Sequence, residues 1–252
     1  MLTNANFLLE LGTEEVPAGY IPPAIEAMKK VFVDSLTASR IGFTGVEVYA
    51  TPRRTAVLID GLAGSQREEE VELKGPSVKA AYDAAGKPTK ALEGFIKGNG
   101  ISAPDVFQRE SEKGAYLFAK KKLDAKKTED LLPGIISQIV SSVPYPKRMR
   151  WSDKSVTFPR PIRYFCILFN DKLVPFDIDG IASSNKTRGH YIQHNRMVEV
   201  GSIKQYGDLL KENGVILNQE ERRGTIRKEL AAAARKAGGE LLEDEALGHY
   251  SS

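Results

Sequence analysis

Apolar runs and helical stripes alternate along this chain and predict its elements. Residues 7–11 are apolar except for Glu10 and have the length of a short buried strand. From about residue 18 to residue 39, apolar side chains recur at helical spacing. Alternating residues at 46–50 and 55–59 then predict two strands, joined by a Thr51-Pro52 turn and paired antiparallel.

The middle of the chain carries weaker patterns, followed by one strong helix. Two short helical patterns cover 77–84 and 89–97. Residues 106–110 and 115–121 predict a hairpin, joined through Glu112-Lys113-Gly114. Residues 128–143 carry the most regular apolar stripe in the sequence and predict an amphipathic helix.

The last third adds further strands and then helices. Apolar runs at 164–169 and 174–178 predict buried strands, and residues 182–194 are polar and typical of a basic loop. Helical patterns follow at 202–212 and 218–236.

Hairpins outnumber strand–helix–strand crossovers, which favours an α+β fold of mixed, mostly antiparallel sheets with packed helices, ending in a helical segment. We expect one or two domains. The predicted segments are a first α+β unit at 1–65, a helical and hairpin insert at 66–145, and a second α+β unit with C-terminal helices at 146–252.

Composition narrows the class of protein. Of the 252 residues, 41% are hydrophobic and 27% charged, which is typical of a soluble globular protein. A single cysteine, Cys166, permits no internal disulfide, and no secretory signal or membrane span is visible, so we expect a cytoplasmic protein. Three histidines and one cysteine are too few for a structural zinc cluster, so no metal site is predicted.

The common nucleotide and catalytic motifs are missing. The sequence contains no Walker A loop, nucleophile elbow or kinase signature. Gly98 and Gly100 match a relaxed dinucleotide fingerprint, but they follow a helical pattern and not a strand. We therefore predict no catalytic residue and no bound cofactor.

The strongest functional candidate is the basic segment 147–163. Arginine and lysine displace counterions from phosphates, and Trp151 and Tyr164 offer flat faces for an unpaired base. The alternative is an ordinary solvated face with Trp151 in the core. The RNA-binding candidates here are Lys147, Arg150, Trp151, Arg160 and Arg163.

Two smaller candidates lie elsewhere. Lys186, Arg188 and His190 lie in a basic loop that also contains glycine and tyrosine. Such a loop can follow an RNA backbone, and the alternative is a surface loop at the end of a strand. Arg53 and Arg54 sit between two predicted strands. They could contact phosphate, or they could pair with Glu14 and Glu15, two acids next to each other in the sequence. We slightly favour the pairing.

Several long motifs carry a family resemblance. They are FLLELGTEEVP (7–17), ATPRRTAVLI (50–59), GPSVKAAYDAAGKPTKALEGF (75–95), PKRMRW (146–151), RPIRYFCILF (160–169) and SNKTRGHY (184–191). In this order they make the chain resemble the N-terminal part of the β subunit of bacterial glycyl-tRNA synthetase. Two positions depart from the family: Tyr191-Ile192 follow His190 where an arginine and an aromatic are usual, and Arg148 is an additional basic residue.

The resemblance implies a portion of an α2β2 glycine–tRNA ligase, inactive by itself. The α subunit would hold glycine, ATP and Mg²⁺, while the β subunit contributes tRNA(Gly) binding and assembly with α and a second β subunit. The alternative is a purely structural scaffold that docks α, with tRNA bound by C-terminal domains absent here. An editing role for Glu14, Glu15, Asp153 and His190 is disfavoured, because glycine is the smallest amino acid and an editing site that excludes the correct product by size is hard to build. Residues 248–252 do not resemble a natural C-terminus.

Overall fold

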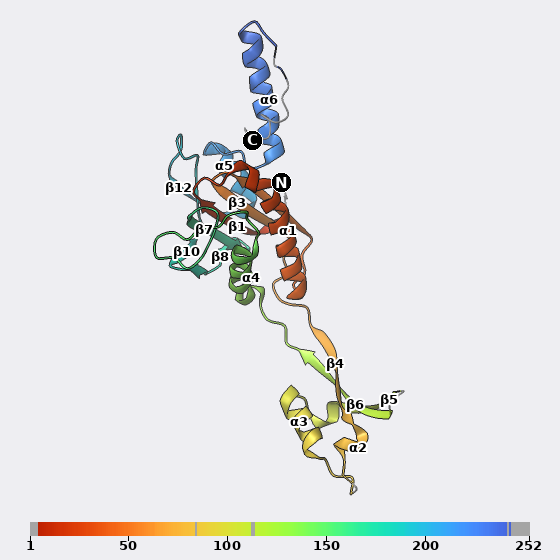
Figure 1. Cartoon of the computed structure of the whole chain (residues 1–252). Helices are drawn as coiled ribbons and strands as arrows, with labels where there is room; N and C mark the ends of the chain where they lie inside the picture. Colours follow the sequence, from red (N-terminus) through yellow and green to blue (C-terminus); the bar gives the residue numbers. More distant parts are fainter. Residues whose placement is uncertain (1–4, 84, 112–113, 241, 243–252) are drawn as a thin grey trace. The chain divides into compact units, whose positions relative to one another are not determined.

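The computed structural model describes residues 5–83, 85–111, 114–240 and 242 (Figure 1). The chain divides into two compact units, Met1–Gln66 with Lys127–Ser252, and Arg67–Lys126. The predicted α+β class is confirmed, with largely antiparallel sheets and a helix near the end of the described chain. Residues 112–113 of the predicted hairpin turn and residues 248–252 lie outside the described residues.

The first unit is built on a seven-stranded sheet within the described residues. Its order is β2-β3-β1-β7-β10-β9, and β8 pairs with β7. Only the β7–β10 pair is parallel. The strands are β1 (Ala5–Thr13), β2 (Gly45–Thr51), β3 (Arg54–Asp60), β7 (Ile162–Phe169), β8 (Lys172–Leu173), β9 (Asp177–Ile178) and β10 (Ile181–Ser184). A separate pair, β11 (Lys186–Arg188) and β12 (Met197–Glu199), follows them.

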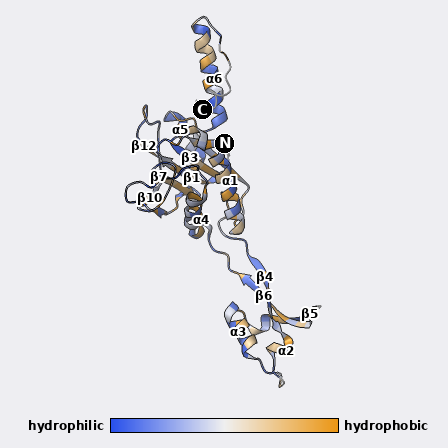
Figure 2. Ribbon diagram, in the orientation of Figure 1, coloured by the Kyte–Doolittle hydropathy of each residue, from blue (hydrophilic) through white to orange (hydrophobic). Residues whose placement is uncertain are grey.

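Strand β1 is the centre of this sheet because it is paired and covered on all sides. Leu9 lies opposite Val57 of β3 and Ile167 of β7. Successive side chains of a strand point to opposite faces. Leu9 therefore joins the larger apolar core on one face, and Leu8 joins a second core on the other. Figure 2 shows hydrophobic residues concentrated along the strands of this sheet.

Helices cover both faces. The larger core contains helix α1 (Ile21–Ala38), which follows a 3-10 turn η1 (Ala18–Tyr20), and helix α4 (Thr128–Ser142). The second core contains helix α5 (Tyr206–Glu212), which follows η3 (Ile203–Gln205). The helices predicted at 18–39, 128–143 and 202–212 are thus confirmed, because each carries a regular apolar stripe that the sheet buries.

Helix α6 (Gln219–Lys236) confirms the last predicted helix but differs from the others. Asn218 caps it and accepts from the backbone N–H groups of Glu220 and Glu221, at 2.9 and 3.2 Å. Within this helix the structure buries no residue. Among the helices of the described chain, none is long and apolar enough to cross a membrane.

Two segments of the first unit differ from the patterns. Of the strand predicted at 174–178 only β9 forms, since Pro175 has no N–H to give a ladder. The stretch 182–194, predicted as a loop, contains most of β10 and all of β11. These short strands were not predicted because they contain polar residues such as Ser183 and Ser184. The two serine hydroxyls donate to the backbone carbonyls of Val174 and Phe165.

The second unit is a small sheet with two helices. Antiparallel strands β4 (Glu69–Ser77), β6 (Gly114–Leu123) and β5 (Val106–Ser111) lie in that order, with α2 (Val78–Ala81), α3 (Lys90–Asn99) and η2 (Ala103–Asp105). The predicted hairpin corresponds to β5 and β6. Strand β4 was not predicted from the sequence. The predicted three-segment division stays a prediction, but α4 packs in the core of the first unit.

Arg148 caps the C-terminal end of helix α4 and links it by hydrogen bonds to Thr157 in the following segment. Its guanidinium donates to the carbonyls of Val140 and Val143 at 2.8 Å, and to the carbonyl and hydroxyl of Thr157 at 2.6 and 3.1 Å. Val140 and Val143 lie where a helix leaves its last carbonyls unsatisfied, and a cation is favourable there. The additional basic residue of this chain is therefore a helix cap.

Arg148→Met should lower the free energy of unfolding by about 2–4 kcal/mol, because several carbonyls lose a charged donor. Arg150→Met, two residues away at an exposed position, should change it by less than about 0.5 kcal/mol. Urea unfolding of both variants makes the comparison. Equal effects from the two substitutions would show that Arg148 does not hold the end of α4.

Candidate functional site

A carboxylate lies fully buried in the middle of β1. Glu10 is 0% exposed. It accepts hydrogen bonds from the hydroxyls of Tyr164 at 2.6 Å and Tyr206 at 2.8 Å, and Arg54 Nε lies 3.3 Å away. Strand register brings two of these partners together, because Arg54 of β3 and Tyr164 of β7 both lie opposite Gly12, two residues beyond Glu10 on the same face.

Burial and charge fix the protonation of this cluster. Burial, followed by the nearby Glu10 carboxylate, raises the pKa of Tyr164 and of Tyr206 well above the ordinary value. Burial alone would lower the pKa of Arg54, but Glu10 and the two phenols raise it, and the net shift is upward. Both phenols therefore stay protonated as donors, and Arg54 stays charged at 5% exposure.

Gly12 makes room for this arrangement. A Cβ atom at Gly12 would overlap the ring of Tyr164. The glycine of the LGTEE sequence is thus required by the close approach of an aromatic ring to the β1 backbone.

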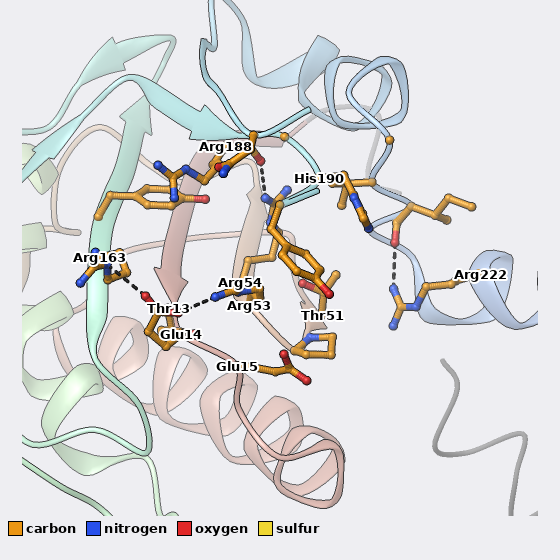
Figure 3. Close-up of a pocket in the computed structure, with 18 residues that line it drawn as sticks. Thr13, Glu14, Glu15, Thr51, Arg53, Arg54, Arg163, Arg188, His190 and Arg222 are labelled. Atoms are coloured by element: carbon orange, nitrogen blue, oxygen red, sulfur yellow. Dashed lines mark hydrogen bonds and ion pairs between the residues drawn. The ribbon is translucent and has the colours of Figure 1, made fainter. Parts of the chain in front are cut away.

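A pocket of about 460 Å³ opens beside this cluster (Figure 3). The ends of β1, β3, β7 and β11, the loop after β11, the turn before α6 and the start of α6 line it. Arginine dominates its charge, with five guanidiniums against two carboxylates. These residues are Arg53, Arg54, Arg163, Arg188 and Arg222, with Glu14 and Glu15.

Glu14 lies between two of these arginines. Arg53 donates to its carboxylate, and Arg163 Nε lies 3.3 Å from it, as the dashed lines of Figure 3 show. All three side chains are partly exposed, so each pair adds little stability. The pairing of Arg53 with an acid that the sequence favoured is present, while Arg54 pairs with Glu10.

Arg54 also links the buried cluster to β11. It donates to the backbone carbonyl of Arg188. Among the described residues, its Nη1 is buried and has no hydrogen-bond partner. A buried donor left in this state costs about 1–3 kcal/mol or more.

His190 lines the pocket, and one nitrogen of its ring is held by the backbone. Its Nδ1 accepts from the backbone N–H groups of Ile192 at 3.3 Å and Gln193 at 3.2 Å, which places the ring proton on Nε2. Its own backbone N–H donates to the Asn213 carbonyl at 2.8 Å. The preceding residue, Gly189, has to be glycine, because a Cβ atom there would overlap the His194 carbonyl.

Arg222, in the first turn of α6, is a pocket residue that sequence reasoning missed. It donates to the carbonyls of Ile216 at 2.8 Å and Ala50 at 3.3 Å, and its partial burial lowers its pKa. The Asn218 cap signals the start of this helix. No local pattern, however, shows that the helix reaches the end of β2, which lies far away in the sequence.

Only some of the site residues predicted from the sequence line the pocket. Arg163, Arg188 and His190 line it together with Arg53, Arg54, Glu14 and Glu15. The predicted residues outside it are Lys147, Arg150, Trp151, Arg160 and Lys186. Trp151 is partly buried and packs on the larger core, while Arg160 donates to the Glu15 carbonyl at 3.0 Å. In the described part of the chain, no group of three or more histidines, cysteines or acids is placed to hold a metal.

Comparison with known proteins gives one family. Residues 7–249 match the sequence profile described as glycyl-tRNA synthetase beta subunit. The glycine–tRNA ligase beta subunit of Syntrophotalea carbinolica is 38% identical over 244 residues, covering 97% of this chain and 36% of the relative. That of Clostridioides difficile is 40% identical over 243 residues, covering 96% and 35%. The chain thus spans about a third of the length of the curated relatives that it matches.

Glu10→Gln should lower the free energy of unfolding by about 3–5 kcal/mol, because it leaves the Arg54 charge buried without a counter-ion. Glu15→Gln, at an exposed position nearby, is the matched control and should change it by less than about 0.5 kcal/mol. Adding Arg54→Met to Glu10→Gln should recover part of the loss. A single Glu10 variant as stable as the control would contradict the buried pair.

Gly12→Ala should destabilise the first unit by more than about 1 kcal/mol, because Tyr164 must move away from its hydrogen bond to Glu10. Gly19→Ala is the control, since no heavy atom lies within 4 Å of a Cβ built there. Thermal unfolding measures both. Equal stability of the two variants would show that Tyr164 is not confined by Gly12.

Proposed function

Because the chain belongs to the glycyl-tRNA synthetase beta subunit family, we propose that it contributes tRNA binding to a glycine–tRNA ligase. The ligase would be an α2β2 heterotetramer in the cytoplasm, and this portion would bind no cofactor and be inactive by itself. ATP and Mg²⁺ would act at the α subunit. The partners would be that α subunit, tRNA(Gly) and the second β subunit.

The observation that carries this proposal is the arginine-lined pocket. Five arginines and two glutamates line it, and because the buried Glu10 carboxylate balances Arg54, the formal charge is +2. The net charge of the whole chain is +3, so much of the excess basic charge lies at this pocket. Arginine binds phosphate through paired donors, which suits an RNA backbone better than it suits a neutral ligand.

The proposed tRNA contacts follow from the pocket and from the basic residues outside it. Arg163, Arg188 and His190 would contact phosphate or sugar oxygens, with Arg53 and Arg222 beside them. Lys147, Arg150, Trp151, Arg160 and Lys186 stay predicted contacts outside the pocket. The Arg148 guanidinium already donates to the carbonyls of Val140, Val143 and Thr157, so we do not include Arg148 among the tRNA contacts.

Helix α6 favours a second role in assembly. It is 18 residues long and none of them is buried. Isolated helices of this length gain most of their stability from packing, so α6 offers an unused face to another subunit or to the rest of the β subunit. Co-purification of the fragment with α, compared with its binding to tRNA alone, separates this scaffold role from RNA binding. Retention of α without tRNA binding would favour the scaffold.

The tRNA proposal predicts a change in salt dependence. In the full tetramer, Arg163→Gln and Arg188→Gln should each weaken tRNA(Gly) binding and reduce the slope of log affinity against log salt by about 0.7–0.9 per lost phosphate contact. Arg109→Gln is the control, because Arg109 lies in the second unit, paired with Glu72 at 2.7 Å. Unchanged affinity and slope in both pocket variants would overturn the proposal.

A further inference from the structure

Flat groups line the pocket next to its arginines. The Arg53 guanidinium lies 4.6 Å from the centre of the Tyr191 ring. The His190 ring is 5.1 Å from Tyr191, with an angle of 35° between the planes. Tyr191 is 45% exposed. Unpaired bases stack on aromatic rings and on guanidinium planes, so Tyr191 and Arg53 together form a surface of the right kind.

The two aromatic residues that the sequence suggested for stacking are less suitable. Trp151 packs against the larger core. Tyr164 donates its hydroxyl to Glu10, and its ring covers Gly12. Tyr191 is the aromatic residue that lines the pocket and is substantially exposed, although its position was noted in the sequence only as a departure from the family.

The pocket also offers unused donors for an anion. Arg54 Nη1 is buried without a hydrogen-bond partner in the described chain. The Nε2 proton of His190 is available, because Nδ1 is occupied by two backbone N–H groups. Glu14 pairs with both Arg53 and Arg163, and its single negative charge leaves a net charge of +1 on these three residues, which favours an anion.

The size of the pocket limits what it can hold. A volume of about 460 Å³ lies in the range of small-molecule sites and is far too small for a duplex. It is nevertheless larger than a phosphate ion requires. A ligand with one planar group and one phosphate matches the stacking surface, the donors and the volume together.

We propose that this pocket binds one unpaired ribonucleotide of the RNA, with its base against Tyr191 and Arg53 and its phosphate at the arginines. This inference rests on the proposed tRNA-binding function and makes it more specific. Single-stranded RNA and a free nucleoside monophosphate share this chemistry, so the experiment includes both.

The test uses the full-length ligase and a labelled single-stranded RNA pentamer. Tyr191→Leu should weaken pentamer binding by about 5- to 150-fold, because one base loses its stacking partner. Tyr191→Phe, which keeps the ring, should bind like the parent. Tyr82→Leu is the matched control: Tyr82 is 37% exposed and lies in the second unit. The salt slope should stay constant in Tyr191→Leu, since no charge is lost.

Competition identifies the ligand. Nucleoside monophosphates should displace the pentamer from the parent better than inorganic phosphate or a duplex of equal charge, and this advantage should disappear in Tyr191→Leu. The proposal is overturned if Tyr191→Leu binds the pentamer like the parent, if inorganic phosphate competes equally well, or if the substitution releases α and not RNA.

The two proposals fail in different ways. If Arg163→Gln and Arg188→Gln weaken tRNA binding while Tyr191→Leu has no effect on the pentamer, the nucleotide pocket is wrong and the tRNA proposal stands. If Tyr191→Leu weakens the pentamer but the arginine variants leave the tRNA salt slope unchanged, the pocket binds nucleotides and the tRNA proposal is wrong.

Discussion

The first unit depends on one buried carboxylate. Glu10 lies in the central strand β1, where an unpaired charge would be very costly. Tyr164 from β7, Tyr206 from α5 and Arg54 from β3 surround it with donors. These contacts join residues up to 196 positions apart in the sequence, so the cluster fixes the sheet against α5. A buried ion pair need not stabilise the fold more than apolar residues would, but it requires one arrangement of its partners.

The same cluster positions the pocket. Arg54 extends from Glu10 to the Arg188 carbonyl, and this contact links the start of β3 to the end of β11. Beyond β11 the chain passes through Gly189 to His190 and Tyr191, which are thereby brought to the ends of β1 and β3. The proposed RNA-binding residues thus surround a rigid structural charge pair. Two kinds of arginine meet here: Arg54 holds the structure together, and Arg163 and Arg188 are exposed enough to bind a ligand.

The sequence predicted most elements because their apolar periodicity is strong, as in α1, α4 and β7. It failed where polar residues form strands, as at Ser183 and Ser184, and where a charged start concealed β4. For the site, the sequence supplied Arg163, Arg188 and His190 from local basic patterns. It could not supply Arg222 or the partners of Glu10, because these contacts depend on how distant segments pack. Glu10, an acid within an otherwise apolar strand, was the one feature of the sequence that indicated a buried cluster. The spacing of residues along the chain did not identify its partners.

The proposed function depends on RNA occupying the arginine-lined pocket. A cryo-electron microscopy structure of the full ligase with bound tRNA(Gly) would show whether it does. We expect an RNA phosphate in hydrogen-bond contact with Arg163 or Arg188, and an unpaired base stacked on Tyr191. A complex in which tRNA is well defined, but this pocket is free of RNA or filled by the α subunit, would contradict it.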